Sequence, residues 1–221
     1  TAVNSINFAR IVAQCVYYFT AAASLGAGYG RAVNFVVPTG NFGDIFAGEA
    51  AARMGLPVER LVIATNVNDI LSRALASGNY ETGRATPTLS PSMDIQVASN
   101  FERALFEASG RDGQWMADAM RGFSQTRRLN IPSLTLGALR TRYLAGRADD
   151  TETIATIARV HRECGVIIDP HTAVGVAVAG KLAGQFNGPI VALATAHPAK
   201  FSAAVTQAIG KSSELPPHLG D

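Results

Sequence analysis

Lysine and cysteine are both scarce in this chain. Among its 221 residues, lysine occurs only as Lys181, Lys200 and Lys211, so few amines are available for covalent chemistry. The two cysteines, Cys15 and Cys164, form no disulfide framework and have no metal-ligand spacing. Both lie in helical apolar patterns, which predicts buried free thiols in a reducing compartment. We therefore expect a cytoplasmic protein without a metal site.

The chain also lacks a basic surface and an uninterrupted hydrophobic run. Its 19 basic and 17 acidic residues give a net charge of +2, and the basic residues are scattered, which argues against nucleic-acid binding. The longest apolar stretch, residues 11–27, is interrupted by Gln14, Thr20 and Ser24. It is interpreted as a buried helix, and no membrane partner is expected. A hydrophobic content of 48% is enough for the core of one large domain, or of one and a half domains.

The most informative segment is NFVVPTGNFGDIFAGE at residues 34–49. A β-branched and aromatic run at 32–37 predicts a buried strand, and helix-period apolar residues at 44–54 predict a helix. Between them, Gly40 and Gly43 allow positive φ and a close approach of the backbone to a ligand. The free N–H groups of the first helical turn, with the helix dipole behind them, would suit a phosphate. An ordinary βα turn has the same composition, so spacing alone leaves both interpretations open.

Strands and helices alternate through much of the chain. Further buried strands are predicted at 60–66 and 189–195, and helices at 6–25, 68–77, 151–164 and 172–182. The glycine-rich turn at 26–30 follows a helix and precedes a strand, the reverse of a dinucleotide-binding motif, so it is interpreted as a helix stop. The alternation predicts an α/β fold with a doubly wound, mostly parallel sheet flanked by helices.

Ligands of such sheets bind outside the carboxyl ends of the strands. In this chain those ends are the loop at Gly40, the segment 65–69 and the segment 195–198, and all three are polar. We expect them to converge on one crevice. Asn68 and Asp69 would shape its wall or cap the following helix, and capping alone would explain Asp69.

The alternation lapses between residues 79 and 150. Residues 86–92 contain two prolines and predict an extended surface loop. Short helices are predicted at 100–108 and 114–123. We interpret 79–150 as a largely helical insertion beside the sheet, within a unit that extends over residues 1–221.

Six distinctive blocks of sequence occur in order along the chain: NSINFAR at 4–10, PTGNFGD at 38–44, ATNVNDIL at 64–71, PSMDIQVASNFER at 91–103, DPHTAVG at 169–175 and TAHPAKF at 195–201. This set resembles the threonine synthase family, which are pyridoxal-phosphate enzymes of the tryptophan-synthase-β structural family, also called fold type II. The resemblance covers essentially the whole chain but only the later part of the family's sequence.

The resemblance implies a cofactor site for pyridoxal 5'-phosphate. An Asp44 carboxylate that faced a phosphate dianion would repel it, so we expect its backbone N–H to bind while the side chain turns away or caps the helix. Thr195 matches the hydroxyl residue that meets the pyridine nitrogen. A neutral hydroxyl does not hold that nitrogen protonated as a carboxylate would. The residues that match the family's cofactor-phosphate loop are Gly40, Asn41, Phe42, Gly43 and Asp44.

The resemblance also implies a substrate site near the start of the chain, at Asn4, Ser5, Asn7 and Arg10. Asn7 and Arg10 are three residues apart and would share a helix face. Because guanidinium binds phosphate well, we propose Arg10 for the substrate phosphate, although a solvated surface arginine would show the same pattern.

Two histidines could carry protons, His171 and His197. Both lie at predicted helix starts beside proline, and a structural role is the simpler interpretation of each.

The family's Schiff-base lysine lies in a Phe-Lys-Asp type motif, which this chain lacks. Lys181 is at the end of a predicted helix, Lys211 lies in a Ser- and Pro-rich tail, and Lys200 follows Pro198 on what should be the next helix. None of these positions suits the Schiff-base lysine. We therefore expect a fragment whose upstream sequence is missing, with no catalysis and at most weak, noncovalent cofactor binding.

By resemblance, the intact enzyme converts O-phospho-L-homoserine and water to L-threonine and phosphate. Two alternatives stay open: a phospho-lyase that releases an oxo acid and ammonia, and a noncatalytic domain that serves as a binding module. The sequence does not indicate the oligomeric state.

Overall fold

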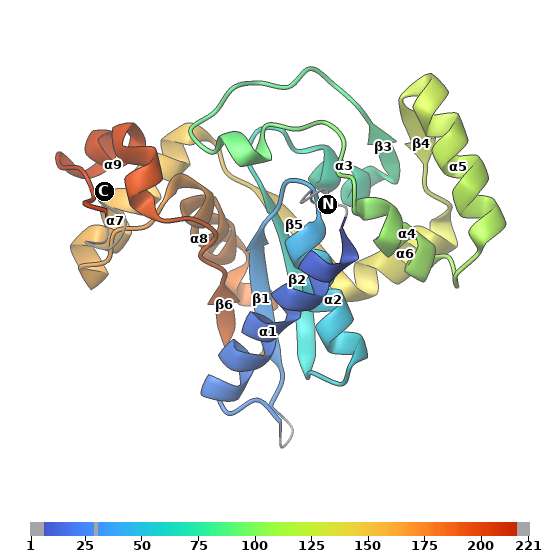
Figure 1. Cartoon of the computed structure of the whole chain (residues 1–221), viewed down its shortest axis with the longest axis horizontal. Coiled ribbons are helices and arrows are strands. Elements are labelled where there is room, and N and C mark those ends of the chain that lie inside the picture. The colour runs from blue at the N-terminus through green and yellow to red at the C-terminus, as the bar shows by residue number, and fades with distance from the viewer. Residues whose placement is uncertain (1–6, 29–30, 216–221) are drawn as a thin grey trace.

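The computed structural model describes residues 7–28 and 31–215. Within them, the main sheet has the strand order β5-β2-β1-β6, and every neighbouring pair is parallel (Figure 1). This confirms the predicted α/β fold with a parallel sheet. The strands of this sheet are β1 (Val33–Pro38), β2 (Val58–Thr65), β5 (Tyr143–Arg147) and β6 (Ile190–Ala192).

Helices cover both faces of the sheet. Side chains of a strand alternate between its two faces, so apolar residues on each face pack against a layer of helices. Phe35 and Val37 of β1 join the larger core cluster, under α1 (Phe8–Ser24) and α2 (Gly43–Arg53). Val36 joins a smaller cluster on the opposite face, under α8 (Pro170–Leu182). Both faces of β1 are thus buried, which explains why its sequence, apart from Asn34, is apolar without alternation.

The remaining elements extend the molecule on either side of the sheet (Figure 1). A two-stranded antiparallel sheet, β3 with β4, lies at one end with α5, while α7 and α9 pack together at the other. These elements are α3 (Ile70–Ser77), β3 (Asn79–Glu81), η1 (Pro91–Met93), α4 (Phe101–Ala108), α5 (Gly113–Thr126), β4 (Arg128–Asn130), α6 (Ser133–Arg142), α7 (Asp150–Cys164), η2 (Ala183–Gln185), η3 (Pro198–Phe201) and α9 (Ser202–Ile209).

The region predicted as a helical insertion contributes to the main sheet. Its last strand, β5, pairs with β2 from Leu61↔Tyr143 to Thr65↔Arg147. The helix α6, which precedes β5, is absent from the sequence-based interpretation. The part of residues 79–150 that lies beside the main sheet, and does not belong to it, therefore ends before Tyr143.

The first helix, α1, is only half buried, contrary to the prediction of a buried helix. Ile11, Cys15, Tyr18 and Ala22 face the core. The opposite side of the helix exposes large apolar side chains: Phe8, Val12, Val16, Tyr17 and Phe19. No helix in the described part of the chain is long and apolar enough to cross a membrane.

The cysteines differ in burial, although both were predicted to be buried. Cys15 is buried on the core-facing side of α1, and burial raises the pKa of its thiol. Cys164 is exposed, because it is the last residue of α7. Both are free thiols, as expected.

Candidate functional site

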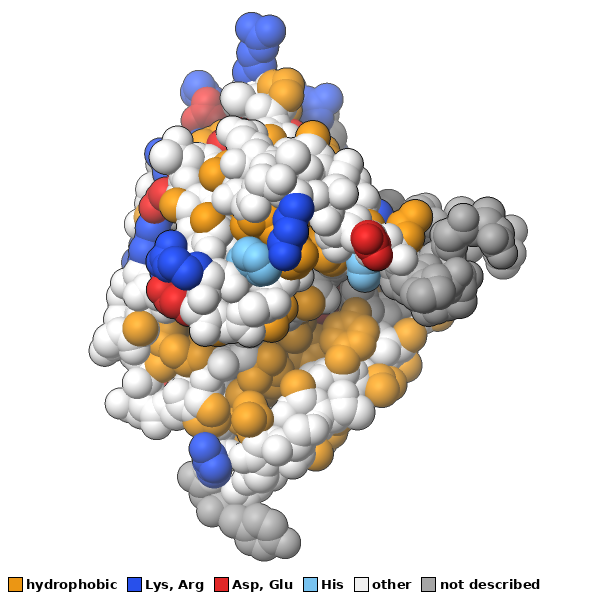
Figure 2. All heavy atoms as spheres, turned by 90° about the vertical axis from the view of Figure 1, so that its left-hand side faces the viewer, with side chains coloured by type: hydrophobic (Ala, Val, Ile, Leu, Met, Phe, Trp, Pro, Cys, Tyr) orange, Lys and Arg blue, Asp and Glu red, His pale blue; other side chains and the backbone are white. Residues whose placement is uncertain are grey.

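A cavity of about 710 Å³ lies at the carboxyl ends of β1 and β6, beside α1. Its walls come from α1, from the β1–α2 loop, from η1, from the start of α8 and from the segment after β6. Figure 2 shows hydrophobic side chains in a hollow across the middle of the α7–α9 side of the molecule. The lining residues include Arg10, Gln14, Tyr17, Gly40, Asn41, Gly43, Asp44, Ser92, Met93, His171, Leu193 and Thr195.

The glycine loop between β1 and α2 forms one wall of the cavity. Gly40 faces the backbone of η1 so closely that a Cβ on it would lie 2.6 Å from the Ser92 carbonyl oxygen. Gly40 does not adopt a positive φ. The left-handed residue of the loop is instead Phe42, with φ 70°. Gly40 is thus packed against the backbone of η1, whereas the predicted close approach to a ligand stays a prediction. The positive φ expected at the glycines lies on Phe42 instead.

The strained backbone at Phe42 is held by packing. Its side chain is buried against two aromatic rings, with ring centroids 5.2 Å from Phe101 and 5.4 Å from Tyr143. A non-glycine residue at positive φ costs of order 1–3 kcal/mol, and such strain persists where the surroundings fix it. Asn41 adds to the fixation, because its carbonyl oxygen accepts the Asn100 N–H at 3.0 Å.

The helix α2 begins at this loop without a side-chain cap. Phe42 occupies the N-cap position, and the Gly43 N–H donates to Asn41 Oδ1 at 2.9 Å. The N–H groups of Asp44 and Ile45 belong to the first turn and have no intrahelical acceptor. Together with the positive end of the helix dipole, they make the start of α2, which lines the cavity at Gly43 and Asp44, a candidate anion site.

Asp44 lies at the mouth of this anion site. Its side chain does not cap α2; instead, the Tyr18 hydroxyl hydrogen-bonds to the Asp44 backbone oxygen at 2.9 Å and to Oδ1 at 3.3 Å. Burial raises the pKa of the Asp44 carboxyl to about 6, against the lowering effect of the Tyr18 hydrogen bond. A carboxyl with this pKa can become neutral near an anion, which reduces the repulsion expected from the sequence.

Across the cavity from the loop, Thr195 and His171 form a second wall. The Thr195 N–H donates to Thr172 Oγ1 at 3.4 Å, and the Ser92 N–H donates to His171 Nε2 at 3.2 Å. His171 is buried, and its Nδ1 lies 2.9 Å from Asp169 Oδ1. His171 is thus a structural residue of the cavity wall, as its sequence context suggested.

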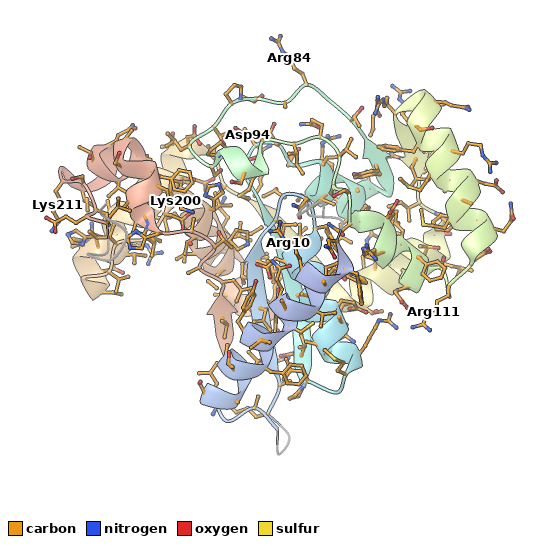
Figure 3. The ribbon with its side chains drawn as sticks, viewed as in Figure 1. Arg10, Arg84, Asp94, Arg111, Lys200 and Lys211 are labelled. Carbon is orange, nitrogen blue, oxygen red and sulfur yellow. The ribbon has the colours of Figure 1, made fainter. Side chains whose placement is uncertain are left out.

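The predicted substrate residues separate in the structure. Arg10 lines the cavity from α1 (Figure 3). Asn7 caps α1, since its Oδ1 accepts the Ala9 N–H at 3.0 Å, and it does not line the cavity. Asn4 and Ser5 lie outside the described residues.

The carboxyl end of β2 does not reach the cavity, which corrects the prediction that three strand ends converge. Asn66 and Asn68 are buried and donate to Asp94 Oδ1 at 2.8 and 2.9 Å. Asp69 occupies the N-cap position of α3 without capping it and pairs with Arg73 and Arg147. This strand end therefore anchors the loop that carries η1.

The three lysines lie away from the cavity lining. Lys181 donates to the Arg147 carbonyl oxygen and pairs with Glu152. Lys200 and Lys211 are exposed at the α9 end of the molecule (Figure 3). His197 is exposed as well and caps η3 through the Ala199 N–H.

Several cavity residues were not assigned to the site from the sequence. Gln14 and Tyr17 follow Arg10 at helical spacing on α1, and this polar stripe in an apolar helix was the available signal. Ser92 and Met93 belong to the PSMD block that carried the family resemblance, but nothing in their sequence places them beside Gly40.

Comparison with known proteins identifies the class and then the proteins that the chain matches. Residues 172–221 match the family model for the C-terminal part of threonine synthase. The crystal structure of pyridoxal-phosphate-bound threonine synthase from Brucella melitensis superposes with a TM-score of 0.96 at 56% identity, covering 99% of this chain and 47% of that one. The yeast threonine synthase structure covers the same shares with a TM-score of 0.88 at 39% identity.

The fold is therefore that of the fold-type II pyridoxal-phosphate enzymes. Threonine synthase from Pseudomonas aeruginosa is 49% identical over the whole of this chain, which covers 47% of that protein. The chain corresponds to the C-terminal portion of the threonine synthases that it matches. It spans about half the length of the curated relatives it matches.

Proposed function

We propose that this chain binds the phosphate end of pyridoxal 5'-phosphate in the β1–α2 loop. The observation that carries the proposal is the uncapped N-terminus of α2, which faces the cavity between Gly40 and Asp44. The close approach of Gly40 to Ser92 fits a backbone cradle, because no side chain intervenes. A cavity of about 710 Å³ is large enough for a cofactor and a small substrate.

Each wall of the cavity then has a distinct task. The N–H groups of Asp44 and Ile45 hold the phosphate, with Gly43 ordered by Asn41. Thr195 presents a hydroxyl group to the ring nitrogen. When bound, the cofactor supplies an electron sink for carbanions at the substrate's α-carbon. This chain orients that group and encloses it, which excludes water.

We further propose that the protein at the full length of its relatives converts O-phospho-L-homoserine and water to L-threonine and phosphate. In this reaction Cβ loses a proton and the Cγ–O bond to phosphate breaks; hydroxide from water then adds to Cβ, Cγ gains a proton, and the released phosphate takes up the remaining proton. A second anion site is needed for the substrate phosphate. Arg10 fits this role because it lines the cavity from α1 and carries a guanidinium.

The test is a product analysis on the protein extended to the length of its curated relatives. Supplied with O-phospho-L-homoserine, it should release threonine and phosphate in equal amounts. Release of an oxo acid and ammonia would identify a phospho-lyase instead, and no turnover would favour a noncatalytic binding module.

The same assay tests the role of Arg10. Arg10→Ala should raise the KM for phosphohomoserine by about tenfold or more, because a charge-assisted contact to phosphate is lost. Arg121→Ala, on the exposed surface of α5, is the matched control and should leave the KM unchanged. An Arg10→Ala variant with the parent's KM would remove Arg10 from the substrate site.

The isolated 221-residue chain should not turn over substrate, since none of its lysines reaches the cavity. Incubation with pyridoxal phosphate followed by borohydride should leave no saturable, site-specific adduct on Lys181, Lys200 or Lys211. A stoichiometric adduct on one of them would contradict this assignment.

A further inference from the structure

Asp169 is a buried carboxylate at the centre of a hydrogen-bond network behind the cavity. It caps the N-terminus of α8, and the residue is 1% exposed. Its Oδ1 accepts the backbone N–H of His171 at 2.9 Å and that of Thr172 at 3.4 Å. The Thr172 hydroxyl donates to Oδ2 through a short contact.

Two of these partners continue the network to the cavity walls. Thr172 Oγ1 accepts the Thr195 N–H at 3.4 Å, and His171 Nε2 accepts the Ser92 N–H at 3.2 Å. Ser92 and Thr195 both line the cavity. Asp169 is therefore one intermediate side chain away from each of two walls that come from distant parts of the sequence.

His171 faces the Asp169 carboxylate behind these walls. Its Nδ1 lies 2.9 Å from Asp169 Oδ1, and its Nε2 accepts the Ser92 N–H at 3.2 Å. Burial alone would raise the pKa of Asp169. The hydrogen bonds from His171 and Thr172 outweigh it and hold the pKa below its ordinary value, so the carboxylate stays ionised.

We propose that Asp169 is a positioning residue for the cofactor ring. Asp169 fixes Thr195 through Thr172, and it supplies negative charge behind the wall that meets the ring nitrogen. A hydroxyl group at that nitrogen is neutral, whereas a buried carboxylate acts over a longer distance in a low-dielectric interior. Asp169 thus favours a protonated ring and a stronger electron sink. The inference rests on the proposed function, in which Thr195 faces this nitrogen.

The probe for this role is pyridoxine 5'-phosphate, which has the ring and phosphate but no aldehyde. Its hydroxypyridine ring absorbs at different wavelengths with the nitrogen protonated and unprotonated, so the bound spectrum reports the protonation directly. Asp169→Asn keeps the size of the side chain and removes the charge. It should lower the equilibrium constant for protonating the bound ring by about threefold to tenfold.

A second pair of variants covers the case in which Asp169→Asn fails to fold. Thr172→Val removes the hydroxyl that links Asp169 to Thr195 and should lower ring protonation, and Thr172→Ser should restore it. A purely structural role would change stability or affinity and leave the ratio of the two absorption bands unaltered.

The outcomes separate this inference from the proposed function. Saturable binding with an unchanged band ratio in Asp169→Asn and in Thr172→Val would overturn the role of Asp169 and leave the phosphate site intact. Absence of pyridoxine 5'-phosphate binding to the parent chain would overturn both.

Discussion

Gly40 and Phe42 show how single residues shape the loop that faces the cavity. A glycine is required at position 40, because the Ser92 carbonyl oxygen occupies the space in which a Cβ would lie. Phe42 adopts the left-handed conformation and is held there by Phe101 and Tyr143. The aromatic packing thus stabilises a backbone turn that aims the N–H groups of α2 at the cavity.

Replacing Gly40 by alanine should disrupt this loop. The new Cβ would lie 2.6 Å from a backbone oxygen, so η1 or the loop must shift. We expect a loss of about 1–3 kcal/mol in the free energy of unfolding, together with weaker binding of a phosphate ligand. Chemical denaturation and a phosphate-ligand titration measure the two effects.

Gly137→Ala is the matched control. Gly137 lies inside α6 with open space where a methyl group would be added, so alanine should stabilise the chain by about 0.5–1 kcal/mol and leave ligand binding intact. Equal behaviour of the two variants would contradict the close approach at Gly40.

Asp44 predicts a pH dependence of stability. Its pKa is raised from 3.8 to about 6 in the folded chain, so the folded state binds a proton more tightly than the unfolded state. The free energy of unfolding should therefore fall as pH rises through this window, by up to roughly 3 kcal/mol from this group.

Asp44→Asn should remove that component, and denaturation curves at about pH 4 and about pH 7 measure it. Asp118→Asn, an exposed carboxyl on α5, makes the same charge change and should keep the parent's profile. An unchanged profile in Asp44→Asn would show that the carboxyl is better solvated than the structure indicates.

At the scale of elements, the loop between β3 and α4 is held by a polar cluster as well as by the buried side chains of Met93 and Ala98. Asp94 accepts hydrogen bonds from Asn66, Asn68 and the Thr88 hydroxyl on Oδ1, and from the Thr88 N–H on Oδ2. Figure 3 shows Asp94 on this loop, above the sheet. The cluster fixes η1, which carries Ser92 to the cavity.

Asp94→Ala should remove the acceptor that the buried amides of Asn66 and Asn68 share with Thr88, and leave the loop with fewer hydrogen bonds. We expect a loss of about 2–4 kcal/mol in the free energy of unfolding and faster hydrogen exchange at the Thr88 N–H. Asp118→Ala, which breaks an exposed ion pair, should cost less than about 1 kcal/mol. Unchanged exchange at Thr88 would mean that other contacts hold the loop.

Sequence patterns predicted the elements that have strong apolar periods. The run at β1, the helix α2 and the helices α7 and α8 agree with the structure to within two residues. The strand β5 and the helix α6 were missed, because SLTLGALRTR has a central glycine and YLAGR is short and only partly apolar. Their conformations depend on pairing with β2 and on packing against α4, which no local pattern encodes.

The candidate site could be indicated from the sequence where one short segment forms it. The loop from Gly40 to Asp44 is contiguous, so its glycines and the following helix indicated a candidate phosphate loop, and the family resemblance favoured it over an ordinary βα turn. The contributions of Ser92 and His171 arise from contacts across the fold, since 79 residues separate the two partners of their hydrogen bond. The left-handed Phe42 was also hidden, because aromatic residues rarely adopt that conformation.

For the whole molecule, the similarity to threonine synthases and the structure agree on a cofactor scaffold. The parallel sheet, the loop at Gly40 and the wall at Thr195 enclose one cavity, and the lysines lie elsewhere. The central claim is that this chain holds the phosphate end of the cofactor by the backbone of the β1–α2 loop.

A ³¹P NMR titration of the 221-residue chain with pyridoxine 5'-phosphate tests this claim most directly. We predict a saturable change in the phosphorus signal. Inorganic phosphate should reverse this change, whereas pyridoxine without phosphate should not. Gly40→Ala should weaken the change, and Gly137→Ala should leave it as in the parent chain. An unperturbed phosphorus signal, or equal binding by the parent and Gly40→Ala, would contradict it.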